Sequence, residues 1–215
     1  MNKKEKAARI VSLLEERYPE AQCALRYEGE AWKLLVMGRL SAQCTDARVN
    51  IVCAELFARF PTAEALANGD LAEIEDLVRP CGLYRMKAAQ IKEACRMLVD
   101  EYGGVLPTEM DDLLRFPGVG RKIANLLRGD IYALPAIVAD THCIRISEHL
   151  GLTAAGEKRP EKVEETLVSL ISPEKQSDFC HRLVMFGREV CIARAPKCGE
   201  CPLTELCSKY IREHK

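Results

Sequence analysis

The sequence predicts an all-α fold. Apolar residues recur at three- and four-residue spacing from Val49 to Phe60, from Leu71 to Val78 and from Ala88 to Val99. This spacing is typical of helices that bury one face. No segment shows the sustained alternation of apolar and polar residues that a half-buried strand requires. We therefore expect short helices joined by short loops.

Helix boundaries can be predicted from local signals. Pro61 ends the first helix because proline cannot continue the hydrogen-bond ladder. Asp70 and Glu73 have the spacing of a capping box at the start of the second helix, and Pro80 stops that helix. Gly103 closes the third. Each boundary thus coincides with a change in the apolar pattern.

The second half of the chain continues in helices. Thr108 is a candidate cap for a short helix that runs through Leu114, and a further short helix is expected over residues 120–128. Apolar spacing predicts later helices over 163–171 and 173–186.

Composition narrows the class of protein. The chain has 215 residues, 48% hydrophobic and 29% charged, with a net charge of -1. No apolar run approaches the length of a membrane span, and no signal-peptide core follows the basic start, so we expect a cytoplasmic protein without membrane association. The net charge excludes coating of nucleic acid by bulk charge. If the protein binds DNA, it does so through a local patch.

Four cysteines near the C-terminus suggest a metal centre. Cys191, Cys198, Cys201 and Cys207 have the spacing C-x6-C-x2-C-x5-C. A disulfide framework fits poorly, because the chain has 11 cysteines and shows no secretory signal. Zinc and an iron–sulfur cluster both remain open from the spacing alone, with the wide outer gaps favouring the cluster slightly.

A glycine-rich turn lies between the two short helices and is a candidate phosphate site. Its residues are Pro117, Gly118, Val119, Gly120 and Arg121. Glycines leave backbone N–H groups accessible at the start of a helix, where phosphate binds readily. An ordinary helix–helix turn is the alternative, and the pair Arg121-Lys122 favours phosphate.

Several motifs occur in the order found in the endonuclease III family, which the chain resembles from about residue 30 to 207. The motifs are Leu40-Ser41-Ala42-Gln43 with Asp46, Gly82-Leu83-Tyr84, residues 117–122 with Ala124-Asn125, Val138-Ala139-Asp140-Thr141-His142, and the four cysteines. The resemblance implies a [4Fe–4S] cluster on the cysteines. It also implies two helical lobes with a DNA cleft between them: a helix–hairpin–helix lobe over 24–134, and a cluster lobe over 1–23 and 135–215.

The resemblance further implies the chemistry of a DNA glycosylase and abasic-site lyase. Lys122 matches the amine nucleophile that forms a Schiff base with C1′ of a damaged nucleotide, and Asp140 matches its carboxylate partner. From the residues alone, Lys122 is a surface lysine contacting phosphate and Asp140 is a helix N-cap. Asp140 can serve in both roles, because a capping carboxylate is rigidly aimed.

Further DNA contacts follow from the same resemblance. Gln43 and Leu83 match residues that fill the space left by an extruded base. Arg194 and Lys197 place positive charge on the cysteine loop. Asp46 and His142 are expected to line the site or to have structural roles. Three departures from the family pattern, Cys44, Leu114 and Ile123, leave Lys122 and Asp140 intact.

The expected function is therefore base excision repair. We expect a monomer that removes oxidised pyrimidines from duplex DNA and cleaves the strand 3′ to the abasic site by β-elimination. It would associate with the nucleoid through DNA. Two alternatives remain: a monofunctional mismatch glycosylase, whose relatives generally lack lysine at the Lys122 position, and a non-catalytic DNA-binding or redox-sensing protein on the same fold.

Overall fold

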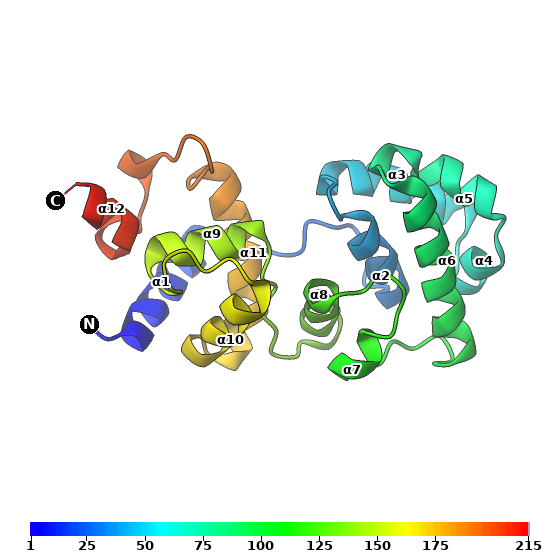
Figure 1. Ribbon diagram of the computed structural model, residues 1–215, viewed down its shortest axis with the longest axis horizontal. Helices are drawn as coiled ribbons and strands as arrows, with labels where there is room; N and C mark the ends of the chain where they lie inside the picture. Colours follow the sequence, from blue (N-terminus) through cyan, green and yellow to red (C-terminus); the bar gives the residue numbers. More distant parts are fainter. Residues whose placement is uncertain (215) are drawn as a thin grey trace. The chain divides into compact units, whose positions relative to one another are not determined.

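The computed structural model describes residues 1–214, in which all regular secondary structure is helical, so the all-α prediction is confirmed (Figure 1). The chain divides into two compact units, a central unit Cys23–Tyr132 and a terminal unit made of Met1–Gln22 and Ala133–Lys215. The lobe boundaries expected from the sequence lie within two residues of this division. Lys215, the end of the expected cluster lobe, lies outside the described residues. Among the helices of residues 1–214, none has both the length and the apolar character of a bilayer span.

The central unit is built around one buried helix. Every residue of α2 from Lys33 to Leu40 is buried, and α6 and α8 pack against it. The helix α6 also packs against α4 and α5, as Figure 1 shows. The helices of this unit are α2 (Ala31–Leu40), α3 (Asp46–Arg59), α4 (Ala63–Asn68), α5 (Leu71–Val78), the 3₁₀ helix η1 (Arg79–Cys81), α6 (Tyr84–Asp100), α7 (Met110–Leu113) and α8 (Arg121–Tyr132).

Side-chain caps start several of these helices. Thr62 accepts a hydrogen bond from the Ala65 amide at 3.0 Å and caps α4. Asp70 accepts from the Glu73 amide at 3.0 Å and caps α5. The Glu73 carboxylate binds the Arg59 guanidinium instead, so only the Asp70 half of the expected capping box forms. This ion pair ties the end of α3 to the start of α5.

The expected cap at Thr108 is wrong. The short helix α7 covers only Met110–Leu113, with Glu109 at its N-cap position. The Thr108 carbonyl accepts a hydrogen bond from the Arg128 guanidinium at 3.1 Å, which holds this residue before the helix begins. The helix α8 ends at Tyr132, four residues later than expected.

The terminal unit joins the two ends of the chain. The buried Arg182 on α11 donates to the carbonyl of Tyr18, directly after α1, at 3.3 Å, and it pairs with Glu15 on α1. Asn2 and Glu5 form a complete capping box at the start of α1. The helices are α1 (Lys3–Arg17), α9 (Thr141–Leu150), α10 (Pro160–Leu170), η2 (Pro173–Lys175), α11 (Gln176–Glu189), η3 (Cys198–Glu200), η4 (Thr204–Leu206) and α12 (Ser208–Glu213).

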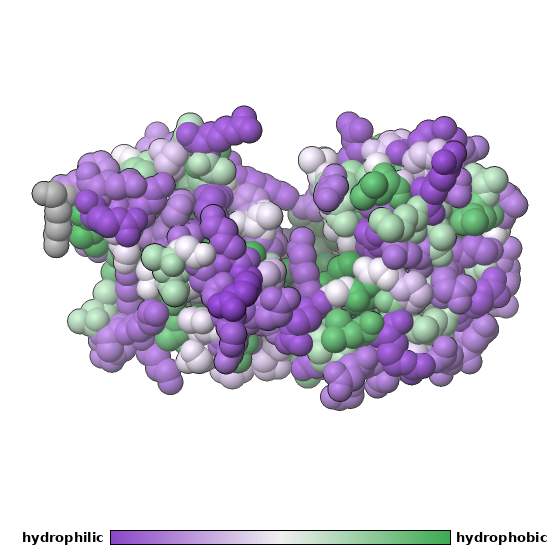
Figure 2. Space-filling view, viewed as in Figure 1, coloured by the Kyte–Doolittle hydropathy of each residue, from purple (hydrophilic) through white to green (hydrophobic). Residues whose placement is uncertain are grey.

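Hydrophilic residues cover most of the face of each unit shown in Figure 2, with hydrophobic residues in scattered patches. The larger exposed apolar side chains include Leu83 and Met86, beside the start of α6. Single exposed apolar residues are common on protein surfaces. Such a residue therefore suggests a function only where it lies at the predicted site.

Candidate functional site

The predicted hairpin forms a tight turn before α8. The Val119 amide donates to the Phe116 carbonyl at 3.0 Å, and Gly118 has a φ of 78°, which glycine adopts at little cost. Phe116 is buried and fixes the turn in the core, whereas Gly118 and Gly120 are exposed. The turn therefore presents its backbone to solvent at the N-terminus of α8, the geometry that favours a phosphate ligand.

Arg39 on α2 supports this turn from inside the protein. Its side chain is only 8% exposed, and its Nε donates to Gln90 Oε1 on α6 at 2.6 Å. Burial lowers the pKa of the Arg39 guanidinium. The hairpin thus rests on a hydrogen-bonded pair of side chains from two core helices.

Lys122 is the second residue of α8, and its side chain is exposed. The next residue, Ile123, faces the core: a Cβ placed on Gly38 of α2 would lie 3.1 Å from Ile123 Cγ2. Ile123, a departure from the family pattern, therefore packs α8 against α2. Lys122, directly before Ile123 and directly after the hairpin, remains exposed to solvent.

Gln43 and Leu83 are both exposed, and both adopt left-handed backbone conformations. Their φ angles are 55° and 50°, which costs on the order of 1 kcal/mol for a residue with a Cβ. Gln43 lies in the turn between α2 and α3, and Leu83 occupies the N-cap position of α6 with 55% of its surface exposed. The central unit therefore carries the hairpin, Lys122 and both of these residues.

Asp140 belongs to the terminal unit and caps α9, as the local sequence predicts. One carboxylate oxygen accepts from the Cys143 amide at 2.7 Å, and the Asp140 amide donates to the Val138 carbonyl at 2.8 Å. The Val138 amide in turn donates to Cys180 Sγ on α11 at 3.2 Å. The carboxylate is therefore fixed to α9 by its cap, while the extended segment before it is fixed to α11.

His142 has a packing role at the interface of α9 and α11. A Cβ placed on Gly187 would collide with the His142 ring and would lie 3.0 Å from Ile146 Cδ1. His142 Nδ1 also lies 3.5 Å from the Arg145 guanidinium. Asp46, the other residue for which lining or structural roles are expected, is the first residue of α3.

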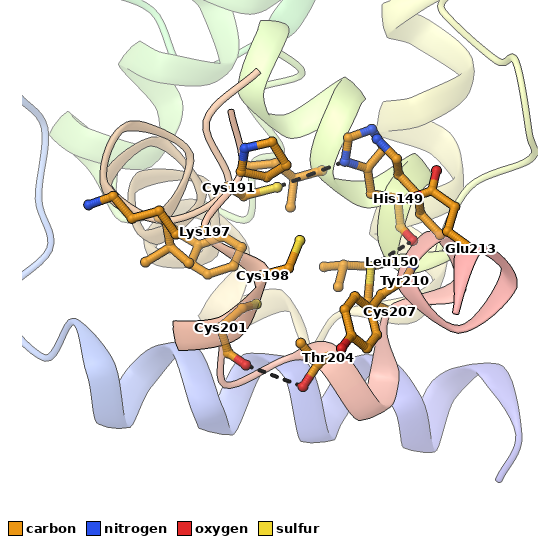
Figure 3. Close-up of a pocket in the computed structure, with 15 residues that line it drawn as sticks. His149, Leu150, Cys191, Lys197, Cys198, Cys201, Thr204, Cys207, Tyr210 and Glu213 are labelled. Atoms are coloured by element: carbon orange, nitrogen blue, oxygen red, sulfur yellow. Dashed lines mark hydrogen bonds between the residues drawn. The ribbon is translucent and has the colours of Figure 1, made fainter. Parts of the chain in front are cut away.

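The four cysteines of the C-terminal loop surround one cavity of about 60 Å³ (Figure 3). Their sulfur atoms point toward this shared space, and Leu150 and Tyr210 lie beside it. Within residues 1–214, no three His, Cys, Asp or Glu side chains lie close enough together to hold a single metal ion. The four predicted ligands nevertheless line one common volume, which has room for a group larger than a single ion.

The chemistry of this cavity suits a metal cluster bound by thiolates. Burial raises the pKa of the Cys191 and Cys201 thiols, so a thiolate here needs positive charge beside it. Amide groups of Leu203 and Tyr210 donate to Cys201 Sγ at 3.4 Å and Cys207 Sγ at 3.5 Å. Such N–H···S bonds are common around cysteine-ligated iron–sulfur clusters, whose potentials they tune. The residues present therefore fit the expected [4Fe–4S] cluster.

Two side chains of α9, which sequence reasoning missed, hold this loop. Arg145 donates to the Cys191 carbonyl at 2.7 Å and lies 3.5 Å from Cys191 Sγ. His149 Nδ1 lies 3.8 Å from Cys191 Sγ, and the His149 carbonyl accepts from Cys207 Sγ at 3.4 Å. Their i, i+4 spacing places both on one face of α9, which was the available signal.

The basic residues of the loop lie at the surface. Arg194 and Lys197 are both exposed, and the Lys197 side chain extends away from the sulfur atoms in Figure 3. The Lys197 amide donates to the Val190 carbonyl at 2.9 Å, which closes the loop back onto the end of α11. The loop thus places its cysteines inward and its positive charge outward.

Comparison with known proteins agrees with these features. Residues 36–173 match the HhH-GPD superfamily base excision DNA repair proteins, and residues 191–207 match the iron–sulfur binding domain of endonuclease III. The endonuclease III of Synechocystis sp. is 44% identical over 96% of this chain and 93% of its own length.

Two solved structures are similar along the whole chain. A non-covalent endonuclease III–DNA complex has a TM-score of 0.92 and 38% identity, covering 99% of both chains. A trapped endonuclease III–DNA covalent intermediate has the same TM-score and identity, covering 100% of both chains. The cysteine loop is thus the iron–sulfur domain of this protein, and its cofactor is a [4Fe–4S] cluster. The chain belongs to the endonuclease III family of the HhH-GPD superfamily, the bifunctional DNA glycosylases and abasic-site lyases of base excision repair.

Proposed function

We propose that this enzyme removes oxidised pyrimidines, such as thymine glycol and dihydrouracil, from duplex DNA and cleaves the strand 3′ to the resulting abasic site. Lys122 acts as the nucleophile and Asp140 as its carboxylate partner. The protein acts as a monomer on the DNA of the nucleoid. The main support is the position of Lys122, an exposed amine on α8 directly after a turn whose two glycines are exposed to solvent.

The reaction begins when the neutral Lys122 amine attacks C1′ of the damaged nucleotide. A bond forms between Lys122 Nζ and C1′, the bond from C1′ to the base breaks, and the base leaves with the electron pair and takes up a proton. Opening of the sugar ring leaves a Schiff base on Lys122. Loss of a proton from C2′ then expels the 3′ phosphate, which cleaves the strand.

Asp140 supplies negative charge in this reaction. Its carboxylate is fixed by the hydrogen bond from the Cys143 amide, so it is already oriented before DNA binds. A carboxylate held in this way accepts the ammonium proton or stabilises positive charge that develops on the sugar. The second carboxylate oxygen remains available for this purpose, because the cap uses only one.

Gln43 and Leu83 would fill the space that the extruded base leaves. Extrusion costs a few kcal/mol, and side chains inserted into the stack offset that cost. The polar amide of Gln43 suits contact with an unpaired base, and the apolar Leu83 suits a wedge in the opposite strand. Cys191, Cys198, Cys201 and Cys207 would hold the cluster, whose binding gives the basic loop a fixed scaffold.

The test is covalent trapping with borohydride. The cluster-loaded protein is incubated with a duplex that contains one thymine glycol, beside the variants Lys122→Ala and Lys158→Ala. Lys158 is an exposed lysine of the terminal unit and serves as the matched control. We expect a protein–DNA adduct with the unmodified protein and with Lys158→Ala, and none with Lys122→Ala.

Two other results would contradict parts of this proposal. A folded, cluster-loaded protein that binds this duplex but forms no adduct would reject the lyase chemistry for thymine glycol. It would favour a monofunctional or non-catalytic role. An adduct that persists in Lys122→Ala would assign the nucleophile to another amine.

A further inference from the structure

A lysine that the proposed reaction does not use is one of the largest fully buried side chains among residues 1–214. Lys87, on the first turn of α6, is 0% exposed. Its ammonium group donates three hydrogen bonds, each 2.8 Å long, to the carbonyls of Leu40, Ala42 and Cys81. All three of its donors are therefore used by main-chain oxygens.

These carbonyls belong to two turns that are far apart in the sequence. Leu40 ends α2, and Ala42 directly precedes Gln43. Cys81 ends η1, two residues before Leu83. A single ammonium group thus joins the turn that carries Gln43 to the turn that carries Leu83.

Both turns are strained at the residue that they expose. Gln43 and Leu83 are two of four non-glycine residues with positive φ among residues 1–214, and Gly82 beside Leu83 has a φ of 69°. Left-handed conformations of such residues persist only where the surroundings fix them. The three bonds to Lys87 lie directly beside these positions and supply that constraint.

Burial of the Lys87 ammonium group has a cost in free energy. Burial lowers the pKa of Lys87, because the ammonium has lost its water. Carbonyls at the ends of α2 and η1 carry the negative end of each helix dipole and offset part of this cost. An apolar side chain at residue 87 would avoid the desolvation but would leave the three carbonyls without this donor.

We infer that Lys87 is a positioning residue that fixes the spacing and backbone conformation of Gln43 and Leu83, so that the two side chains enter the duplex together. This inference rests on the proposed function, since it takes these residues as those that fill the vacated stack. Lys87 itself does not touch DNA. It acts by holding two turns in one arrangement before DNA binds.

The same helix offers a matched control. Lys92 on α6 also donates to main-chain carbonyls, those of Ala67 at 3.0 Å and of Gly69, at the end of α4. Neither carbonyl is near Gln43 or Leu83 in the sequence. Lys87→Met and Lys92→Met therefore both remove an ammonium that binds carbonyls, but only the first releases the two turns.

The experiment uses the full-length, cluster-loaded protein and a duplex that cannot be cleaved. The duplex carries a tetrahydrofuran abasic analogue opposite 2-aminopurine, whose fluorescence rises when it is unstacked. We expect saturating amounts of the unmodified protein and of Lys92→Met to raise the fluorescence. The Gln43→Ala/Leu83→Ala double variant sets the floor, and Lys87→Met should fall close to it.

Single-turnover excision of thymine glycol gives a second measure. We expect Lys87→Met to lose about tenfold or more in rate, the scale on which misplaced groups act. In the Gln43→Ala/Leu83→Ala background, the further change Lys87→Met should lower the excision rate by less than about twofold, because Lys87 acts through those residues. Lys87→Gln, which retains an amide donor, should recover part of the fluorescence and provides a folded alternative.

The outcomes distinguish a failure of the positioning role from a failure of the proposed function. If Gln43→Ala/Leu83→Ala retains the full fluorescence rise, the proposed role of those residues fails, and the positioning role fails with it. If that double variant loses the signal but folded Lys87→Met keeps it, only the positioning role fails. Equal losses in Lys87→Met and Lys92→Met would also overturn it, since general destabilisation would then explain both.

Discussion

Gly118 lies against the buried side chain of Arg39. A Cβ atom on Gly118 would be 2.5 Å from Arg39 Cδ and 2.9 Å from Gln90 Oε1, and the φ of 78° already disfavours any side chain there. The exposed hairpin and the core are therefore in direct contact at a position that admits only hydrogen.

Gly118→Ala should weaken both the fold and DNA binding. Backbone strain contributes about 1–2 kcal/mol of destabilisation, and displacement of Arg39 adds to it. Gly104→Ala is the matched control, because Gly104 has a φ of 84° but a Cβ placed on it would meet no atom within 4 Å. Thermal melts and DNA titrations should show a larger loss for Gly118→Ala. Equal losses in the two variants would mean that Arg39 moves away from the new Cβ atom without a cost in free energy.

Substitution of Asp140 should separate capping from chemistry. Asparagine caps helices as well as aspartate does, so Asp140→Asn should retain stability while removing the charge. We expect it to lose on the order of 100-fold in excision rate. Asp140→Ala should lose the same activity and also about 0.5–2 kcal/mol of stability with the cap. Full activity in Asp140→Asn would contradict the proposed role of the carboxylate.

Arg145 and Arg194 should affect different properties of the cysteine loop. Arg145→Met removes the bond to the Cys191 carbonyl, so the protein should lose its cluster faster when exposed to a chelator, as followed by visible absorbance. Arg194→Ala should retain the cluster but reduce the salt dependence of DNA binding by about one charge. A change of cluster lifetime in Arg194→Ala alone would reverse these assignments.

Buried thiols should make the protein sensitive to alkali. Burial raises the pKa of Cys95 from 9.0 to about 12, so the folded protein holds this proton more tightly than the unfolded chain. The resulting stabilisation is complete below pH 9 and is lost as the pH rises toward 12, at up to about 1.4 kcal/mol per pH unit. Unfolding of Cys95→Ala, measured at several pH values, should show a shallower decline above pH 9. An unchanged slope would exclude Cys95 as a contributor.

The helices could largely be predicted from apolar spacing, because one buried face leaves a clear signal. The cap at Asp140 was also predictable, since an aspartate before a helical run has few other local uses. Thr108 was misjudged because its carbonyl is held by Arg128, twenty residues away, and such contacts leave no local pattern.

The residues behind the site were harder to predict. Arg39 and Lys87 lie within amphipathic or apolar segments, where a cation is ordinarily assigned to the surface. Only the fold shows that their charged ends reach Gln90 and three main-chain carbonyls. The roles of Lys122, Gln43 and Leu83 remain predictions, because they concern groups that act on DNA.

The composition of the terminal unit from both ends of the chain has a consequence for synthesis on the ribosome. The central unit is continuous, from Cys23 to Tyr132, and can fold as soon as it has emerged. The helix α1 precedes the central unit in the sequence, yet its partners α10 and α11 follow that unit. The apolar face of α1 is therefore covered only after the central unit has been made, and the cysteine loop, which follows α11, closes later still. Iron–sulfur assembly at this loop therefore follows the synthesis of the central unit.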